Sequence, residues 1–127
     1  MTSLEVPYSV ACVLPSLVAL DITNDVAHEV ARADAASGIA FITPRERGLV
    51  RVNEREAGFF ADVEELLERL VPLAAVDRER TLTLLLGART ELVPFADGRL
   101  CLGQWQRILL FGFGDHVAAE WELTLVG

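Results

Sequence analysis

The chain has 127 residues, of which 52% are hydrophobic, and its formal net charge is −8 at pH 7. This length predicts a single domain over residues 1–127 that is large enough to bury a core. The acidic balance argues against a nucleic-acid partner, because affinity for the phosphate backbone comes from Lys and Arg. The sequence has no apolar run of the roughly 20 residues that span a membrane, and its first residues do not resemble a signal peptide, so we expect a cytoplasmic protein without a membrane partner.

All 11 basic residues are arginine, and lysine is absent. Schiff-base catalysis and the lysine of a phosphate-binding P-loop are therefore excluded. The two cysteines, Cys12 and Cys101, lack the paired Cys or His spacing of a zinc site. We interpret both as buried free thiols, since unpaired cysteine is among the most buried residue types.

The first part of the chain predicts two strands followed by a helix. Residues 4–13 and 16–21 are rich in Val and Leu and are typical of strands. Thr23 is a candidate N-cap for a helix whose apolar residues recur at helical spacing and which stops before Gly38. His28 falls on the polar side of that helix, where a surface position is expected.

Strands at 39–43 and 49–53 precede the clearest helix, over residues 57–71. Its apolar residues form one stripe, composed of Phe59, Val63, Leu66, Leu67 and Leu70. The opposite side is acidic and solvated, and Glu65 is placed to pair with Arg69 at i,i+4.

The remainder of the chain predicts only strands, at 80–86, 91–95, 99–102, 105–113 and 118–126. Asp97-Gly98 is a strong hairpin signal, and a second turn carrying His116 is expected near residues 114–116. This order of elements predicts an α+β protein, with mainly antiparallel sheets forming a sandwich-like core and two main helices.

Several short motifs follow one another in a defined order: Asp21-Ile22-Thr23 before the first helix, Asn53-Glu54 at a strand end, and Leu102-Gly103 with Trp105-Gln106 before a later strand. Over about residues 20–127 the chain resembles the YjbQ family, small proteins often described as secondary thiamine-phosphate synthases. The resemblance implies a homotrimer of YjbQ-like α+β domains. It also implies a pocket that uses histidines, the Asn-Glu pair and polar groups near the Trp-Gln run.

The chain departs from the family at these histidines. Where the family has Pro-His-Thr-Thr-Ala, residues 44–48 read Pro-Arg-Glu-Arg-Gly, and a second family histidine position holds Arg80. The family's loop before that position is also shortened here. Arginine stays protonated and cannot replace histidine as a general base or a metal ligand. We therefore expect no metal and no cofactor.

The residues that remain at the family's site define two candidate groups. The candidate catalytic residues are Asn53 and Glu54, and the candidate phosphate-binding residues are Arg45, Arg47, Arg80 and Gln104. Arginine suits phosphate because its planar fork donates two parallel hydrogen bonds. We expect Arg45 and Arg80 to share a shallow pocket beside Glu54. In the alternative interpretation, the arginines only form ion pairs with Glu46, Glu54 or Asp21.

Three functions remain open. The first is a non-catalytic or anion-binding homotrimer whose inherited catalytic site is degraded. The second is a working thiamine-phosphate synthase-type enzyme with an arginine-based phosphate site. The third is a structural or interaction subunit. A phosphate-bearing small molecule and further copies of the chain itself are the expected partners.

Overall fold

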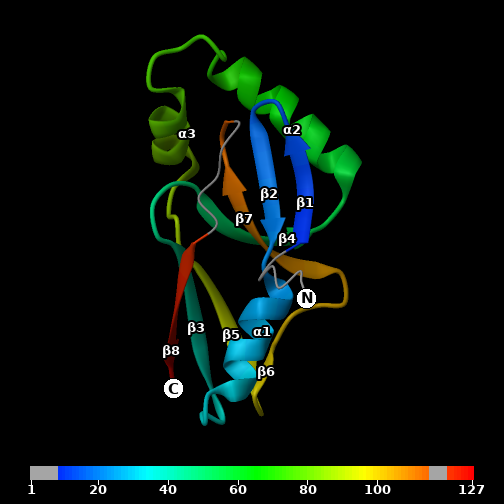
Figure 1. Cartoon of the computed structure of the whole chain (residues 1–127), viewed down its shortest axis with the longest axis vertical. Helices are drawn as coiled ribbons and strands as arrows, with labels where there is room; N and C mark the ends of the chain where they lie inside the picture. The colour runs from blue at the N-terminus through cyan, green and yellow to red at the C-terminus, as the bar shows by residue number, and fades with distance from the viewer. Residues whose placement is uncertain (1–8, 115–119) are drawn as a thin grey trace, which may run out of the picture.

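The structure, a computed structural model, describes residues 9–114 and 120–127. Its elements in chain order are β1 (Ser9–Leu14), β2 (Leu17–Asp21), α1 (Thr23–Arg32), β3 (Ser37–Pro44), β4 (Leu49–Glu54), α2 (Ala57–Leu70), α3 (Arg78–Leu86), β5 (Glu91–Ala96), β6 (Arg99–Leu100), β7 (Gln106–Gly112) and β8 (Trp121–Val126) (Figure 1).

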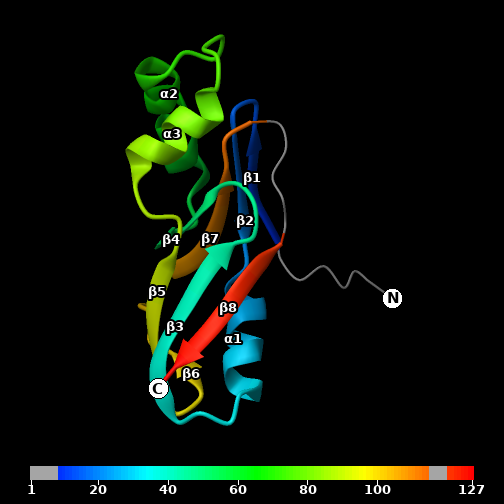
Figure 2. The ribbon, with the colours of Figure 1, turned by 90° about the vertical axis from the view of Figure 1, so that its left-hand side faces the viewer.

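The strands form two four-stranded antiparallel sheets. Sheet A has the order β1-β2-β7-β4, and sheet B has the order β6-β5-β3-β8. Figures 1 and 2 show that α2 and α3 lie at the end of the molecule formed by sheet A, whereas α1 lies beside sheet B. The α+β class with a sandwich-like core, expected from the sequence, is confirmed.

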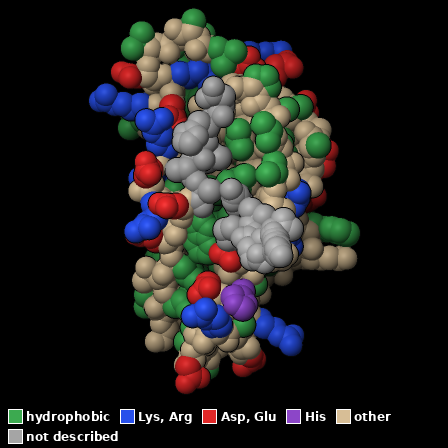
Figure 3. All heavy atoms as spheres, in the orientation of Figure 1, with side chains coloured by type: hydrophobic (Ala, Val, Ile, Leu, Met, Phe, Trp, Pro, Cys, Tyr) green, Lys and Arg blue, Asp and Glu red, His purple; other side chains and the backbone are tan. Residues whose placement is uncertain are grey.

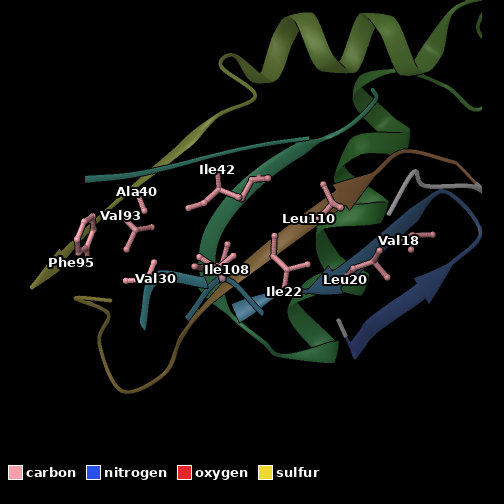
Figure 4. Packing of buried hydrophobic residues seen from close by; sticks show 12 residues of the cluster. Val18, Leu20, Ile22, Val30, Ala40, Ile42, Val93, Phe95, Ile108 and Leu110 are labelled. Carbon is pink, nitrogen blue, oxygen red and sulfur yellow. The ribbon is translucent and has the colours of Figure 1, made fainter. Parts of the chain in front are cut away.

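The central strands of sheet A, β2 and β7, are buried on both faces. Successive residues of a strand point to opposite sides, so these two strands contribute side chains to two different cores. One face joins sheet B and α1 in the larger core, to which it contributes Val18, Leu20, Ile108 and Leu110 (Figure 4). The other face packs against α2 and α3 in a second core through Leu17, Leu49 and Leu109. Sheet A is therefore the central layer of the fold, with sheet B and α1 on one side and α2 and α3 on the other.

The expected strand at 80–86 is wrong, because these residues belong to the helix α3. The alternation of Thr81, Leu82 and Thr83 is typical of a strand, but leucine is also one of the best helix formers. Leu82 is the helix's fully buried leucine and packs into the second core, whereas the three leucines after Thr83 are exposed. The protein therefore has three helices among its described residues instead of two.

The start of α1 also differs from the prediction. Ile22 occupies the N-cap position, and Thr23 is the first helical residue. The hydroxyl of Thr23 accepts a hydrogen bond from the backbone N–H of Ile108 and is thus unavailable as a cap for its own helix. The helix ends at Arg32 and so stops before Gly38, as predicted, and the chain is extended from Ser37 onwards, where it pairs with β5.

The predicted stripe of α2 is only partly buried. Leu67 lies in the second core together with Phe60, a residue outside the predicted stripe, whereas Phe59, Leu66 and Leu70 are exposed. The i,i+4 pair between Glu65 and Arg69 is confirmed.

Several smaller expectations fall within the described residues. The exposed position of His28 and the hairpin turn at Asp97-Gly98, where both residues have positive φ, are confirmed. Cys12 is half-buried, but Cys101 is exposed, so the expectation of a buried thiol is wrong for Cys101. The expected turn at His116 lies outside the described residues. No helix within the described ranges is long and apolar enough to cross a bilayer.

Candidate functional site

A polar groove of about 680 Å³ lies between the β3–β4 turn and the first half of α3. Four arginines line this groove, namely Arg47, Arg78, Arg80 and Arg89. Three carboxylates line it as well, namely Glu46, Asp77 and Glu79. Figure 3 shows arginine and carboxylate side chains gathered over this side of the molecule. The local balance thus favours positive charge, although the whole chain carries −8.

Two arginines of the groove are paired with its carboxylates. Arg47 reaches across the groove to Glu79, with 3.3 Å between Nη1 and Oε1. Arg80 pairs with Asp77 within the wall formed by α3, at 4.0 Å. Both arginine side chains are exposed, and exposed ion pairs contribute little to stability. These two guanidinium groups can therefore exchange their partners at small cost.

The other two arginines form no ion pair with any residue that the structure describes. Arg78 is 8% exposed, and its Nε donates to the carbonyl oxygen of Val71. Its Nη2 is buried without a hydrogen-bond partner among the described residues. Arg89 donates to the carbonyl oxygens of Pro44, Glu46 and Gly48 and so holds the β3–β4 turn against the groove. Carbonyl oxygens accept hydrogen bonds but do not neutralise a full positive charge.

The groove contains only part of the predicted phosphate site. Arg47 and Arg80 line it, as the interpretation of an arginine-based site requires, but Arg45 and Gln104 are not among its lining residues. Arg45 instead pairs with two exposed carboxylates next to and within β8, Glu120 and Glu122. Gln104 is exposed in the connection between β6 and β7.

The predicted catalytic residues also lie elsewhere. Asn53 and Glu54 end β4 and line a depression of about 200 Å³ together with Glu56 and Phe59. Glu54 is not a lining residue of the arginine groove, so the expectation that Arg45, Arg80 and Glu54 share that pocket does not hold. The predicted pairs of Arg45 and Arg80 with Glu46, Glu54 or Asp21 are wrong as well, since their partners lie in β8 and at Asp77.

Asn53 also borders an apolar cavity of about 220 Å³ between α2 and sheet A. Four phenylalanines line this cavity, namely Phe59, Phe60, Phe111 and Phe113. Arg51 is also a lining residue, and its guanidinium donates to the carbonyl oxygens of Val50, Leu86 and Ala88, which joins β4 to the end of α3. The cavity therefore offers a binding partner mainly apolar surface.

Asp21 is the buried centre of a separate polar network. Its Oδ1 accepts hydrogen bonds from the backbone and hydroxyl of Thr23, and its Oδ2 accepts from Arg55 at 3.1 Å and Arg107 at 2.9 Å. Burial raises the pKa of Asp21, but the hydrogen bonds from Arg107 and Thr23 outweigh it and hold that pKa below its ordinary value. Each oxygen of this carboxylate already accepts two hydrogen bonds, which leaves no acceptor site for a substrate. The motif Asp21-Ile22-Thr23 therefore has a structural role.

Residues 9–114 and 120–127 contain no group of three His, Cys, Asp or Glu side chains placed to hold a metal ion. The arginines of the groove can bind anions but stay protonated and do not transfer protons themselves.

Sequence reasoning missed Arg78 and Arg89 as groove residues. The sequence does not mark Arg78, because the pattern of the residues that follow predicts a strand at 80–86. In the structure a helix starts at this point, so the run Asp77-Arg78-Glu79-Arg80 forms its N-terminus and places charged side chains on its first turn. Nothing in the local sequence of Arg89 marks it, because its partners lie more than 40 positions away in the β3–β4 turn.

Comparison with known proteins gives a consistent result. The family model for UPF0047 protein YjbQ-like matches residues 16–120. A UPF0047 protein of Archaeoglobus fulgidus is 33% identical over 104 residues, which cover 74% of this chain and 79% of that protein.

Solved structures share the fold. A protein of the YjbQ/UPF0047 family from Clostridium acetobutylicum aligns with a TM-score of 0.74 at 18% identity, covering 95% of this chain and 100% of its own. A hypothetical protein from Aeropyrum pernix aligns with a TM-score of 0.71 at 24% identity, covering 94% and 96%. The fold, the matched family model and the archaeal relative together establish that this chain belongs to the UPF0047, YjbQ-like family.

Proposed function

We propose that this chain is a non-catalytic, homotrimeric family member that binds a phosphate-bearing small molecule in the arginine groove. The observation that carries this proposal is the convergence of Arg47 and Arg80 with Arg78 and Arg89 on one groove. Arg80 stands where the resemblance places a family histidine, and Arg47 stands where it places a threonine. Arginine at the histidine position removes a group that can transfer protons, and arginine at both positions adds a guanidinium that suits phosphate.

The separation of the candidate residues supports a non-catalytic role. A general base must lie within hydrogen-bond reach of the group whose proton it removes, about 3 Å between heavy atoms, or reach that group through one water. Glu54 lines the depression at the end of β4, whereas the arginines line the groove beside α3. A phosphate held by the arginines would therefore not present its reacting atoms to Glu54 within the same groove.

Exposed apolar side chains support self-association. They gather on α2, on α3 and in the connection between these helices, and they comprise Leu66, Leu70, Leu73, Val76, Leu84 and Leu85. We name this set the α2–α3 apolar surface. Figure 3 includes hydrophobic side chains at this end of the molecule. Clustered apolar surface is usually covered by a partner, and a second and third copy of the chain are the partners that the proposal assigns.

Titration calorimetry with inorganic phosphate and pyrophosphate tests the anion site. Wild-type protein is expected to bind pyrophosphate, and Arg47→Ala to weaken binding by about tenfold, the value of one charge-assisted hydrogen bond. Arg80→Ala is expected to weaken it less, because that side chain is the more exposed. Arg69→Ala is the matched control, since Arg69 pairs with Glu65 on α2 and does not line the groove.

Two results would overturn the proposal. Absence of binding at millimolar pyrophosphate would remove the anion site. Turnover in a thiamine-phosphate synthase assay would replace the non-catalytic role with the alternative enzyme, and loss of that turnover in Glu54→Gln would then assign Glu54 to catalysis.

A further inference from the structure

Glu79 places a negative charge on the first turn of α3, directly inside the arginine groove. Its carboxylate pairs with Arg47 of the β3–β4 turn, 32 positions earlier in the chain. This ion pair crosses the groove, whereas the pair between Arg80 and Asp77 stays within one wall. The Glu79 side chain is 27% exposed and the Arg47 side chain 66%, so the pair is accessible to solvent and to a ligand.

The surroundings of Glu79 favour an anion at this place. The N-terminus of α3 carries partial positive charge, and Asp77 at its N-cap adopts φ 58 and gives no side-chain hydrogen bond to the first turn. Arg78 adds a buried positive charge that no described carboxylate neutralises, and its Nη2 lacks a hydrogen-bond partner among the described residues. A buried charge is screened less than an exposed one, so its field acts across the groove.

The geometry points to Glu79 as an internal competitor that pairs with Arg47 at the position where the ligand binds. This inference rests on the proposed anion-binding function and assigns the ligand's position and chemical class. When the ligand enters, Arg47 exchanges the carboxylate of Glu79 for a phosphate, which then lies between Arg47 and the first turn of α3. Arg78 and Arg89 keep their bonds to backbone carbonyls and supply fixed positive charge throughout.

This exchange defines which anions bind. A ligand with a single negative charge, such as a carboxylate or a phosphodiester, replaces Glu79 charge for charge and gains no electrostatic advantage. A terminal phosphate carries between one and two negative charges at neutral pH and offers three acceptor oxygens. The groove therefore selects phosphate monoesters and diphosphates over monoanions.

Calorimetry with inorganic pyrophosphate at fixed ionic strength tests the competitor role. Glu79→Gln is expected to bind two- to fivefold more tightly than wild type, which is the range that an exposed ion pair supports. Glu79→Asp is expected to tighten binding in the same direction, because the shorter side chain keeps the charge but withdraws it from Arg47. In an Arg47→Ala background the gain in affinity from Glu79→Gln is expected to shrink, because Glu79 then has no arginine partner that its removal could release for the ligand.

Controls separate competition from general repulsion. Asp77→Asn removes an equal charge from the same helix terminus but frees Arg80 instead of Arg47, and its gain is expected to persist in the Arg47→Ala background. Glu65→Gln removes a charge from the outer side of α2 and is expected to leave affinity unchanged. Circular dichroism checks that each variant retains its fold.

The possible outcomes distinguish a failure of the competitor role of Glu79 from a failure of the proposed anion-binding function. If neither wild type nor Glu79→Gln binds pyrophosphate, the anion-binding function itself fails. If wild type binds in an Arg47-dependent manner but Glu79→Gln binds no more tightly than Glu65→Gln, only the competitor role is overturned. An undiminished gain in the Arg47→Ala background, or binding of acetate as tight as that of phosphate, also overturns it while the anion site stands.

Discussion

Asp21 and Arg107 lie 86 positions apart, yet a 2.9 Å hydrogen bond joins Oδ2 of the first to Nε of the second. The bond links the end of β2 to the start of β7, the two central strands of sheet A. Arg55 donates to the same oxygen from the segment between β4 and α2, and its other amino group donates to the carbonyl of Val10 in β1. The carboxylate of Asp21 thus links β2 directly to β7 and, through Arg55, to β1 and to the residue that follows β4.

Replacement of Asp21 is expected to destabilise the fold by about 2–4 kcal/mol, because removing one partner of a buried ion pair leaves the other charges uncompensated. Asp21→Asn keeps the shape of the side chain but removes its charge and turns one acceptor oxygen into an NH2 donor, so the loss of stability reports the ion pairs together with their hydrogen bonds. Denaturant unfolding measures the difference in free energy. Glu65→Gln, which breaks an exposed pair, is the control and is expected to change stability by under about 0.5 kcal/mol. Equal stability of Asp21→Asn and wild type would show that the network contributes nothing.

The same carboxylate makes stability depend on pH. Its folded pKa lies below the ordinary value, so the unfolded chain takes up the proton first as pH falls. The contribution of Asp21 is therefore fully present above the unfolded pKa of about 3.9 and is lost as pH falls through the folded pKa. Unfolding free energies at pH 7 and pH 3 are expected to differ less in Asp21→Asn than in wild type. Parallel pH profiles would contradict the assignment.

The sequence predicted the class of fold because the strands of sheet B and the hairpin at Asp97-Gly98 carry local signals. In β8, for example, Trp121 and Leu123 are half-buried while Glu122 is exposed, as the alternation required. The start of α1 and the nature of α3 were missed because distant contacts decide them. The hydroxyl of Thr23 accepts a hydrogen bond from a strand residue 85 positions away, and α3 is held by the packing of Leu82 on the second core.

The candidate site was predicted in part for a similar reason. The sequence of residues 44–48 predicts three charged side chains in one turn. The direction in which each side chain points depends on the contacts made by the two ends of that turn. The backbone N–H of Arg45 still bonds to Glu120 beside β8, so its side chain joins the carboxylates there. Arg47 lies beyond that contact and reaches α3. The family resemblance could equate sequence positions, but it could not determine these directions.

Gly48 closes the β3–β4 turn that presents Arg47, and it tolerates no side chain. Its φ is +93°, and a Cβ placed there would lie 2.1 Å from the carbonyl oxygen of Phe111. Gly48→Ala is expected to cost roughly 3 kcal/mol, from backbone strain and the clash together. Gly98 is the matched control, because its φ of +74° is similar but no atom lies within 4 Å of its added Cβ. Gly98→Ala is expected to cost about 1 kcal/mol, and equal losses in the two variants would contradict the clash.

The α2–α3 apolar surface is expected to be the contact between copies of the chain. Val76 and Leu84 are 89% and 81% exposed, values that large apolar side chains rarely have unless a partner covers them. The double variant Val76→Gln and Leu84→Gln is expected to shift wild-type trimers to monomers in light scattering. Leu92→Gln changes an exposed leucine of sheet B and serves as the control. A wild-type protein that is monomeric at micromolar concentration would remove the homotrimer from the proposal.

The buried charge of Arg78 is expected to destabilise the fold and to favour anion binding in the groove. The substitution Arg78→Met tests both effects. Its guanidinium is buried, forms no ion pair with a described residue and leaves Nη2 without a hydrogen-bond partner there, which is an unfavourable state for a charged group. Arg78→Met keeps the apolar length of the side chain but removes the charge, at the expense of one hydrogen bond to Val71. We expect stability to remain within about 1 kcal/mol of wild type, because the relief of the buried charge offsets that lost bond.

Pyrophosphate binding by Arg78→Met is expected to weaken by fivefold or more, roughly 1 kcal/mol, even if Arg78 acts only through its field. Arg69→Met, an equal change at an exposed position of α2, is expected to alter neither stability nor binding. Calorimetry and denaturant unfolding on the same samples measure both quantities. A variant that unfolds more easily by 3 kcal/mol while binding pyrophosphate as well as wild type would make Arg78 a structural residue and remove it from the anion site. Preserved stability together with weakened pyrophosphate binding would show that the charge of Arg78 is needed for binding and not for folding.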